Sequence, residues 1–595
     1  MALFISRIKV KNFRNFKRLD LSLCPSAVIV GENKVGKSNL VHAVRLVLDP
    51  SLPDTYRMLK AEDFWDGISK PFSGKEIRIV LEMTGFEEDK AAQAVLTDCL
   101  VKKNPYVARL TYIFRPRAKL DADPSSENDY EYLVFGGNDE KNRVASDVRH
   151  WISVFLLPAL RDAESDLDNW RRSPLRPLLE RLNIDSGRLK TILKDLNEVN
   201  SKLAAEQPVA SLANEITSRI DAMVGTAFGI DTRLGLTPSE GPQLLRSLKL
   251  FVDGDKSRPI SQASLGSANV LFLALLLQKL DASRSDRSLV STILAIEEPE
   301  AHLHPQVQRL LFRYFLGQQY PVLVTTHSPY IASVAPIDSL VLLKQTKKLG
   351  SIGYSTNRLP LSGAERDDLQ RYIDVTRAEV LFAKGVILVE GAAEQFLIPA
   401  FAKFLPDSRG EPVDLDRFGI SVCSVNGTEF GVYRKLLGSQ GMAVPHVVVT
   451  DGDPSQSDGR TVHNGLLRSI KLVEDDNARR DATRGYARRR WNSTRQILAD
   501  QDVFVNEDTL ELELIESFKL ELVRTYRELT GSREKATNFA ALLEEPSENR
   551  TKILSRIERI GKGRFAQRLA PKIEGKKPPA YIKNALDKII KLATR

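Results

Sequence analysis

Acidic residues follow two short apolar segments in the second half of the 595-residue chain. Residues 386–389 and 447–450 have the length and apolar continuity of buried parallel strands. The carboxylates that follow them are Glu390, Glu394, Asp451 and Asp453. Open α/β sheets place their chemistry at the carboxyl ends of strands, so we expect these acids to meet at one edge. Because they would repel one another, the pattern indicates a site for divalent metal ions with oxygen ligands.

A second motif, GENKVGKS at residues 31–38, matches the phosphate-binding pattern G-x-x-x-x-G-K-[ST]. An apolar segment precedes it and an amphipathic helix follows, which is the context that such a loop requires. Backbone N–H groups of the loop would bind phosphates, Lys37 would reach the terminal phosphates, and Ser38 would hold Mg²⁺. The predicted ATP-binding residues of this segment are Gly31, Asn33, Gly36, Lys37 and Ser38.

Other ATP-binding residues are predicted much later in the chain. An apolar segment ends at Glu297 and Glu298, of which the first is placed to assist Mg²⁺ and the second to activate water. A further buried segment ends at His327, which is either a sensor of the terminal phosphate or an ordinary core histidine. Ser264 and Gly266 open an apolar helix, and its N-terminus is either an anion site or a plain cap.

The order P-loop, SLGS, EEPE and histidine resembles the ABC-type ATPase heads of the SMC and RecF-like group, and NFRNF at residues 12–16 matches their first hairpin. This resemblance implies that Ser264 and Gly266 act on ATP held by a second copy of the head, and therefore a homodimer. A helical insertion is expected within the head. It either packs onto its own head or forms a dimer contact.

EGAAE at residues 390–394 followed by DGD at residues 451–453 resembles the Toprim domain of topoisomerases, primases and a group of nucleases, over residues 381–595. The sequence therefore predicts an α/β protein, in which an ABC-type P-loop head with a helical insertion precedes a Toprim domain with a Rossmann-like parallel sheet and a basic helical C-terminal region. The expected divisions are 1–164 and 246–375 for the head, 165–245 for the insertion, 381–550 for the Toprim nuclease domain and 551–595 for the basic segment.

The net charge of +9 is concentrated in two places. Residues 551–595 hold thirteen Lys or Arg against three acids, and residues 479–495 interleave arginines with Tyr486 and Trp491. Such segments are either solvated charged surfaces or surfaces that bind nucleic-acid phosphates and stack bases, and two of them beside the acidic motifs favour DNA. The predicted DNA-binding residues are Arg488, Arg489, Arg490, Lys562 and Arg564.

The composition of the chain indicates its cellular compartment. The longest apolar run, residues 270–277, is too short to cross a membrane, and the N-terminus has no secretory pattern. Three scattered cysteines in no ligand spacing are typical of reduced core thiols, so we expect a cytoplasmic protein.

An ABC-type head followed directly by a Toprim domain resembles the overcoming-lysogenization-defect (OLD) nucleases over essentially the whole chain. The resemblance implies a metal-dependent DNA endonuclease, often in phage defence, with two Mg²⁺ or Mn²⁺ ions in the Toprim site and ATP with Mg²⁺ in the head. The sequence DGD at residues 451–453, followed by a long C-terminal region, resembles the class of OLD nucleases encoded beside a superfamily 1 helicase. This resemblance implies that such a helicase is a possible partner.

The same resemblance assigns the remaining site residues. Glu390 with Glu394 and Asp451 with Asp453 match the two acidic motifs, and a third acid is expected from NEDTLELELI, either Glu511, which we prefer, or Glu513. These two would share a face on a strand but diverge on a helix. Lys562 in GKGRFA matches a late lysine of the family, or is a plain phosphate contact. The predicted catalytic residues are thus Glu298, Glu390, Asp451 and Lys562.

Three functions compete at this point. The first is hydrolytic DNA cleavage by two metal ions governed by the ATPase head, with Lys562 adding positive charge in the transition state. The second is a covalent, topoisomerase-like DNA enzyme, which needs a tyrosine over the acidic site; Tyr433 and Tyr486 have no diagnostic setting. The third is an SMC-like scaffolding ATPase without cleavage. The intact set of acids favours the first.

Overall fold

The computed structural model describes most of the chain, and the following account concerns those residues. They are 3–70, 72–118, 123–144, 146–159, 166–167, 169, 173–182, 184–224, 232, 234, 244, 246, 248, 250–252, 258–259, 264–285, 291–318, 320–346, 348–373, 375–457 and 460–594. Residues 225–231 and most of 233–249, at the end of the predicted insertion, lie outside this set.

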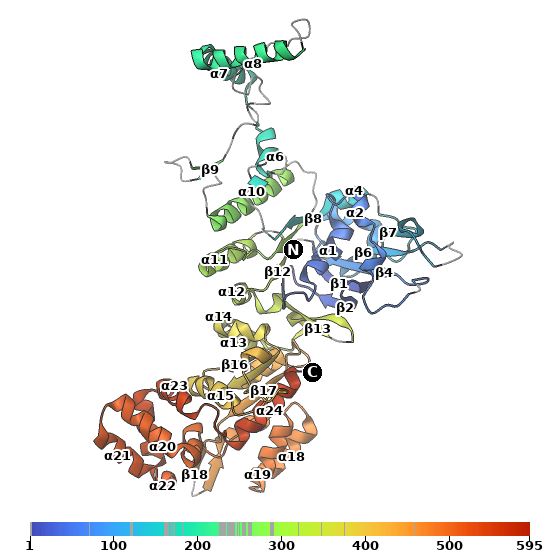
Figure 1. Cartoon of the computed structure of the whole chain (residues 1–595). Coiled ribbons are helices and arrows are strands. Elements are labelled where there is room, and N and C mark those ends of the chain that lie inside the picture. The colour runs from blue at the N-terminus through green and yellow to red at the C-terminus, as the bar shows by residue number, and fades with distance from the viewer. Residues whose placement is uncertain are drawn as a thin grey trace.

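The N-terminal half is built on one twelve-stranded sheet among the described residues (Figure 1). Its central strands are parallel: β8 (Ile152–Leu157), β11 (Ser291–Glu297), β12 (Val322–Thr326), β3 (Ser26–Val30) and β13 (Leu340–Thr346). Since β3 lies between two strands from beyond residue 320, the two halves of the head close into one sheet. The P-loop follows β3 and Glu297 ends β11, so both motifs lie at carboxyl ends of parallel strands, as a nucleotide site requires.

An antiparallel lobe extends the same sheet. Its strands are β1 (Phe4–Phe13), β2 (Phe16–Ser22), β4 (Ile77–Thr84), β5 (Leu100–Lys103), β6 (Tyr106–Pro116), β7 (Tyr130–Gly136) and β14 (Gly350–Ser355), the last of which joins β2 to β13. Alternate residues of β1 such as Ile8 and Val10 are buried, while the residues between them face outward, the pattern of a half-buried sheet. One face of this lobe is therefore left open.

Helices cover the head on its other surfaces. They are α1 (Lys37–Leu48), α2 (Asp54–Arg57), α3 (Lys90–Val95), α4 (Ser146–Trp151), α10 (Leu265–Ser285), α11 (Pro305–Leu316) and α12 (Pro329–Ala332). In α10, the window Leu265–Ala282 is the one stretch among the described residues long and apolar enough to cross a membrane by length and composition. Phe272, Leu273 and Leu280 of this helix are buried in the head core, so it packs as a core helix.

The helical insertion projects from the head. It consists of α6 (Leu175–Glu180), α7 (Ser186–Ala205) and α8 (Gln207–Val224), and Figure 1 shows α7 and α8 lying side by side far from the rest of the molecule. Ile192 and Val199 on α7 and Leu212 on α8 are about half exposed, at 47%, 53% and 50%. The two long helices do not pack onto their own head, which was one of the two arrangements that we considered.

The C-terminal half holds a four-stranded parallel sheet in the order β16 (Ile420–Ser424), β15 (Gly385–Val389), β17 (His446–Thr450) and β20 (Val503–Val505). The described helices that join and surround it are α13 (Gly363–Tyr372), α14 (Val375–Ala378), α15 (Ala392–Ala402), α16 (Phe430–Leu437), α17 (Asn464–Lys471), α18 (Asp476–Ala487), α19 (Trp491–Asp500), α20 (Leu510–Thr530), α21 (Arg533–Leu542), α22 (Pro546–Ile560), α23 (Lys562–Ile573) and α24 (Ala580–Ala593). A two-stranded ribbon, β18 (Pro454–Ser457) and β19 (Arg460–His463), follows β17.

The last helix, α24, packs into the core of the C-terminal half. Its side chains Ile582, Leu586 and Ile589 are fully buried, and a Cβ on Gly385 of β15 would lie 3.0 Å from Ile589 Cδ1. The basic C-terminal segment is therefore amphipathic, with one face packed on the sheet that ends at the acidic residues (Figure 1).

Replacing Ile589 with alanine is expected to lower the free energy of unfolding by about 2–5 kcal/mol, because it leaves a cavity in a packed core. Urea denaturation followed by tryptophan fluorescence measures the loss. The exposed Lys591 of the same helix provides the control, since Lys591→Ala should change stability by less than about 0.5 kcal/mol. Equal, small effects would show that α24 does not form part of this core.

Candidate active sites

Glu390 and Asp451 meet at the carboxyl edge of the Toprim sheet. β15 and β17 pair in parallel with Val389 opposite Val449, so the residues that follow them emerge side by side. Glu390 Oε1 accepts hydrogen bonds from the Thr450 hydroxyl and from Asp451 N, the latter at 3.0 Å. The convergence predicted from the two strand ends is thus what the sheet produces.

Two further acids join this pair from helices. Glu394 lies in the first turn of α15 and Glu511 in the first turn of α20, with only 8% and 7% of their surfaces exposed. Burial, reinforced by Glu511 and Glu390, raises the pKa of Glu394 to about 7. Burial likewise raises the pKa of Asp451 well above its usual range, and Glu390, Glu394 and Glu511 add to this shift. We call Glu390, Glu394, Asp451 and Glu511 the acidic cluster.

Lys562 lies at the edge of the acidic cluster. It begins α23, and its Nζ is 3.2 Å from Glu511 Oε1. Burial works against its charge, but Glu511 and Asp451 outweigh burial and raise the Lys562 pKa. The ammonium group therefore stays charged next to Glu511 and near Asp451, where it partly offsets the repulsion among the carboxylates.

Asp453 occupies a different position from the other acids. Its carboxylate pairs with Arg468 of α17, whose guanidinium also lies 3.9 Å from Glu390 Oε1. Asp453 has a backbone φ of 44°, in the left-handed region that aspartate tolerates better than most residues. Arg468 was not predicted, because an arginine in an ordinary amphipathic helix carries no sequence signal of this contact.

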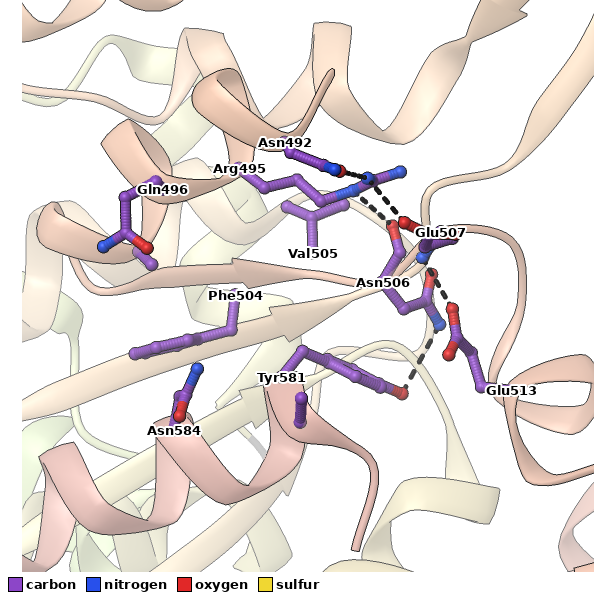
Figure 2. Close-up of a pocket in the computed structure, with 12 residues that line it drawn as sticks. Asn492, Arg495, Gln496, Phe504, Val505, Asn506, Glu507, Glu513, Tyr581 and Asn584 are labelled. Atoms are coloured by element: carbon purple, nitrogen blue, oxygen red, sulfur yellow. Dashed lines mark hydrogen bonds and ion pairs between the residues drawn. The ribbon is translucent and has the colours of Figure 1, made fainter. Parts of the chain in front are cut away.

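Asn506 is a second residue that sequence reasoning missed. It follows β20, donates from Nδ2 to Asp451 Oδ1 at 2.7 Å, and accepts from Gly452 N at 2.7 Å. Figure 2 shows it at the end of a pocket of about 240 Å³, with its amide 3.4 Å from the Tyr581 hydroxyl. Asn506 thus fixes the orientation of the Asp451 carboxylate from behind the acidic cluster.

Glu513 is not brought to the acidic cluster. Residues 510–530 form a helix rather than a strand, so side chains two positions apart diverge. Glu513 Oε1 accepts a hydrogen bond from Glu507 N at 2.7 Å on the pocket side, as Figure 2 shows, while Glu511 faces Lys562. Of the two candidates for the third acid, the geometry favours Glu511.

The acidic cluster suits a divalent cation in its donor chemistry. No three His, Cys, Asp or Glu side chains of the described part of the chain are already gathered as a ligand set. Asp451 is bound by Asn506, and Asp453 by Arg468. However, Glu511 Oε2 is buried without a hydrogen-bond partner among the described residues. A buried carboxylate oxygen without a donor, beside acids whose pKa values are raised, fits a bound hard cation.

The P-loop has the backbone of a phosphate site. Gly36 begins α1 at φ 95°, and a Cβ there would lie 2.0 Å from Asn15 Nδ2, so only glycine fits. Asn15, in the hairpin between β1 and β2, donates to Val35 O at 2.6 Å. Lys37 Nζ folds over the loop to Gly31 O at 2.8 Å. No side chain caps α1, so its first N–H groups remain available for a phosphate.

Three acids face the P-loop from the end of β11. Glu297 interacts with the Ser38 hydroxyl, and burial raises its pKa. Glu298 adopts φ 44° and lies 3.7 Å from His327 Nδ1. With its side chain 49% exposed, His327 is not an ordinary core histidine.

Glu300 is a further residue that sequence reasoning missed. It is 6% exposed, its Oε1 accepts from Thr326 Oγ1 at 2.7 Å and from His327 N at 2.9 Å, and it lies 3.4 Å from His327 Nδ1. Glu300 therefore positions His327 and, with Glu298, opposes the effect of burial on the Lys37 pKa.

Ser264 and Gly266 lie at the start of α10. Ser264 is exposed and its hydroxyl is 2.9 Å from the Ser267 hydroxyl, while a Cβ on Gly266 would meet His302 O at 2.9 Å. Among the described residues, neither makes a hydrogen bond to the P-loop of its own chain. This placement suits the predicted contact with a nucleotide held by a second copy.

The basic residues predicted to bind DNA are exposed. Arg488, Arg489 and Arg490 join α18 to α19, and Arg564 follows Lys562 in α23. Tyr486 and Trp491 pack edge to face with ring centroids 5.0 Å apart, and Trp491 also contacts His463 at 4.7 Å. These two rings therefore help to hold the arginine-bearing connection in place.

Comparisons with known proteins agree with this architecture. A family model described as an AAA domain, and named for the AbiEii toxin of type IV TA systems, matches residues 26–333, more than half of the chain. A model described as "Overcoming lysogenization defect protein-like, TOPRIM domain" matches residues 381–453. An OLD nuclease of Thermus scotoductus is 26% identical over 540 residues, covering 86% of this chain and 91% of that protein.

A second relative and a solved structure match shorter parts of the chain. An endonuclease GajA of Bacillus cereus is 23% identical over 486 residues, 79% of each chain. Among solved structures, the C-terminal region of the Burkholderia pseudomallei OLD protein is 39% identical, covers 36% of this chain and 99% of that chain, and has a TM-score of 0.29.

The fold and both sites thus define a P-loop ATPase of the matched AAA-domain family that carries a Toprim domain. The chain belongs to the OLD family, with an ATPase domain followed by a Toprim domain.

The acidic cluster makes the metal-free protein sensitive to pH. In the folded chain the Glu394 pKa is raised from 4.5 to about 7, so between these values the folded protein keeps a proton that the unfolded chain has released. Its stability should therefore fall as the pH rises through that window, by on the order of 3 kcal/mol from this group alone. Glu394→Gln should remove this slope and melt at a higher temperature in EDTA at pH 8.

Thermal melting across pH checks this, with Glu513→Gln as the control on the neighbouring helix. Added Mg²⁺ should stabilise the wild type and the control more than Glu394→Gln. A Glu394→Gln variant that melts below the wild type in EDTA would contradict the assigned repulsion.

Proposed function

We propose that the chain is a metal-dependent DNA endonuclease whose phosphodiester hydrolysis takes place at the acidic cluster and whose ATPase head controls that activity. The observation that carries the proposal is the acidic cluster itself, with Lys562 beside it, at the carboxyl edge of a parallel sheet. Two Mg²⁺ or Mn²⁺ ions held by Glu390, Glu394, Asp451 and Glu511, with Asp453 as a further ligand, would supply an activated water and neutralise the leaving oxygen.

The chain's own residues would divide the remaining tasks. Lys562 is placed to donate to a non-bridging phosphate oxygen as negative charge develops on it. Asn506 holds the Asp451 carboxylate in one orientation through a 2.7 Å hydrogen bond. Arg468 balances Asp453 and Glu390 from α17. The exposed Arg488, Arg489, Arg490 and Arg564 would contact the DNA backbone on either side.

The tyrosines argue against a covalent intermediate. Tyr433 is 1% exposed in the core, and Tyr486 packs against Trp491. The Tyr581 hydroxyl lies next to Asn506, but burial and the nearby Asp451 raise its pKa well above 10. A nucleophilic tyrosine needs its phenolate stabilised, so the surroundings of Tyr581 oppose that role.

In the head, ATP with Mg²⁺ would bind the P-loop through Gly31, Asn33, Gly36, Lys37 and Ser38, with Glu297, Glu298 and His327 around its terminal phosphate. Ser264 and Gly266 of a second copy would complete the site, which makes a homodimer part of the proposal. The exposed apolar side chains of α7 and α8 would suit the same dimer. Phage defence and a superfamily 1 helicase partner follow from the family resemblance.

A direct contact links the two halves of the chain between the sites. Lys344 on β13, the neighbour of β3, donates from Nζ to Ala443 O at 3.1 Å in the loop before β17. Its burial lowers its pKa to about 8, while Glu32 of the P-loop favours its charge. A cavity of about 610 Å³ lies between the domains here, lined by Glu32, Lys344, Ala443 and the end of α24. Through Lys344, a change at the P-loop would reach the strand that ends at Asp451.

Supercoiled plasmid incubated with Mg²⁺ or Mn²⁺ tests the proposed nuclease site. Wild type and Lys37→Ala should nick and linearise DNA without nucleotide, whereas Asp451→Ala and Glu511→Gln should lose about 100-fold or more of the rate, because a group acting on the transition state is removed. The matched control is Glu513→Gln, on the same helix but turned away, which should keep most of the activity. Equal losses in Glu511→Gln and Glu513→Gln would contradict the assigned geometry.

If no condition gives cleavage, with or without ATP, the scaffolding ATPase replaces the nuclease as the function of this chain.

Lys344→Met tests the proposed link between the sites. Cleavage without nucleotide and the rate of ATP hydrolysis should match the wild type, because Lys344 belongs to neither site. The change in cleavage rate that ATP causes should shrink toward zero, because the contact with Ala443 is lost. Gel-based cleavage with and without ATP measures this, with Lys348→Met beyond β13 as the control. A full ATP effect in Lys344→Met would exclude this route.

A further inference from the structure

The open face of the antiparallel lobe carries an unusual row of charges. On this face, the strand register places Lys11 of β1 directly opposite Arg18 of β2 on one side and opposite Arg78 of β4 on the other. Side chains at such opposed positions lie about 5 Å apart at their Cβ atoms. Three cations thus stand side by side across three neighbouring strands.

Two of the three cations in this row are not balanced by the described part of the protein. Arg78 pairs with Glu76 at 2.8 Å and with Glu140 at 3.5 Å, but neither Lys11 nor Arg18 makes an ion pair with any described residue. Like charges directly opposite one another destabilise a sheet. The fold therefore bears an electrostatic cost here that a negatively charged ligand would remove.

The neighbouring rows of the same face differ in this respect. Arg7 binds Asp20 through two hydrogen bonds of 2.7 Å, and Lys9 lies 3.6 Å from Glu82. These pairs neutralise most of the positive charge on the part of the face that is farther from the hairpin at residues 13–16. The uncompensated charge is thus confined to the end of the sheet nearest that hairpin.

The size of the surface points to an extended ligand. A groove of about 630 Å³ follows this face and is lined by both strands of the hairpin and by β4, with Arg7, Lys9, Lys11, Arg18 and Arg78 among its residues. Neighbouring strands are about 4.8 Å apart, so the row of Lys11, Arg18 and Arg78 spans roughly 10 Å across three strands. A single small anion would reach only part of this area, whereas a duplex presents one charge per about 1.7 Å of its axis.

We propose that this face is a second DNA-docking site, which binds the phosphate backbone of the duplex on the ATPase head. The choice of DNA rests on the proposed nuclease function. The site is separate from the acidic cluster: in Figure 1, β1, β2 and β4 lie in the N-terminal part of the head, and the helices around the acidic cluster lie in the other half of the molecule.

The site also borders the nucleotide. Asn15 in the hairpin donates to Val35 O of the P-loop and to the Ser351 hydroxyl, and Arg14 binds Asn39 of α1 at 2.8 Å. DNA on this face would therefore contact the strands that support the P-loop.

Binding of a short labelled duplex by the full chain, measured by fluorescence anisotropy in EDTA over a range of salt, tests the site without any cleavage. The double variant Lys11→Gln/Arg18→Gln should bind at least about tenfold more weakly at 0.1 M salt, and its plot of log K against log salt should be shallower by about 2, since each phosphate contact contributes about 0.9. Asp20→Asn, which frees Arg7, should bind more tightly than the wild type.

The matched control is Lys102→Gln/Lys103→Gln, two exposed lysines of β5 on the edge of the same sheet. It should keep the affinity and the salt slope of the wild type. Melting temperatures of both double variants should not fall, because the substitutions remove exposed charges only.

An unchanged slope in Lys11→Gln/Arg18→Gln, or equal losses in both double variants, would overturn the proposal. An unchanged slope would mean that this face binds an acidic protein partner instead of DNA. Equal losses would mean that DNA binds any basic surface of the protein equally well. The outcome is independent of the nuclease proposal, because binding in EDTA is read without cleavage and the plasmid assay reports on the acidic cluster alone.

Discussion

The main constraint on the Toprim half is the repulsion among four carboxylates at the edge of one parallel sheet, three of them buried and Glu390 half-buried. The fold forces Glu390 and Asp451 together, because the strands that carry them are hydrogen-bonded neighbours. Glu394 and Glu511 are added by helices whose other faces fill the core. The protein offsets this repulsion with Lys562, Arg468 and the amide of Asn506, but no described residue donates a hydrogen bond to one oxygen of Glu511. The remaining imbalance would give the site an affinity for divalent cations.

The ATPase head has the opposite kind of site. There, backbone N–H groups at the start of α1 have no side-chain cap and can bind an anion. Gly36 is held against Asn15 so tightly that no other residue fits, and this fixes the loop where α1 begins. Glu297, Glu298 and Glu300, at and just beyond the end of β11, face the P-loop. Because β13 lies beside β3 and contacts the loop before β17 through Lys344, the anion site and the cation site share one continuous hydrogen-bonded framework.

The sequence predicted what depends on local pattern. Apolar segments ending in acids located Glu390 and Asp451, and the spacing of the P-loop located Lys37. Contacts that depend on three-dimensional register had no such signal: Asn506 meets Asp451 only because β20 pairs with β17, and Lys11, Arg18 and Arg78 align only through strand pairing. The choice between Glu511 and Glu513 required the element type, since a helix separates what a strand would bring together. The domain divisions proposed from the sequence stay predictions.

If the Toprim site works as proposed, the acidic cluster binds catalytic cations without help from the nucleotide. Electron paramagnetic resonance of Mn²⁺ titrated into the nucleotide-free chain tests this most directly, since free and bound Mn²⁺ give distinct signals. The account predicts binding of about two ions per chain in the wild type, unchanged in Lys37→Ala and strongly weakened in Glu511→Gln. Binding that appears only with ATP, or that survives in Glu511→Gln, would contradict it.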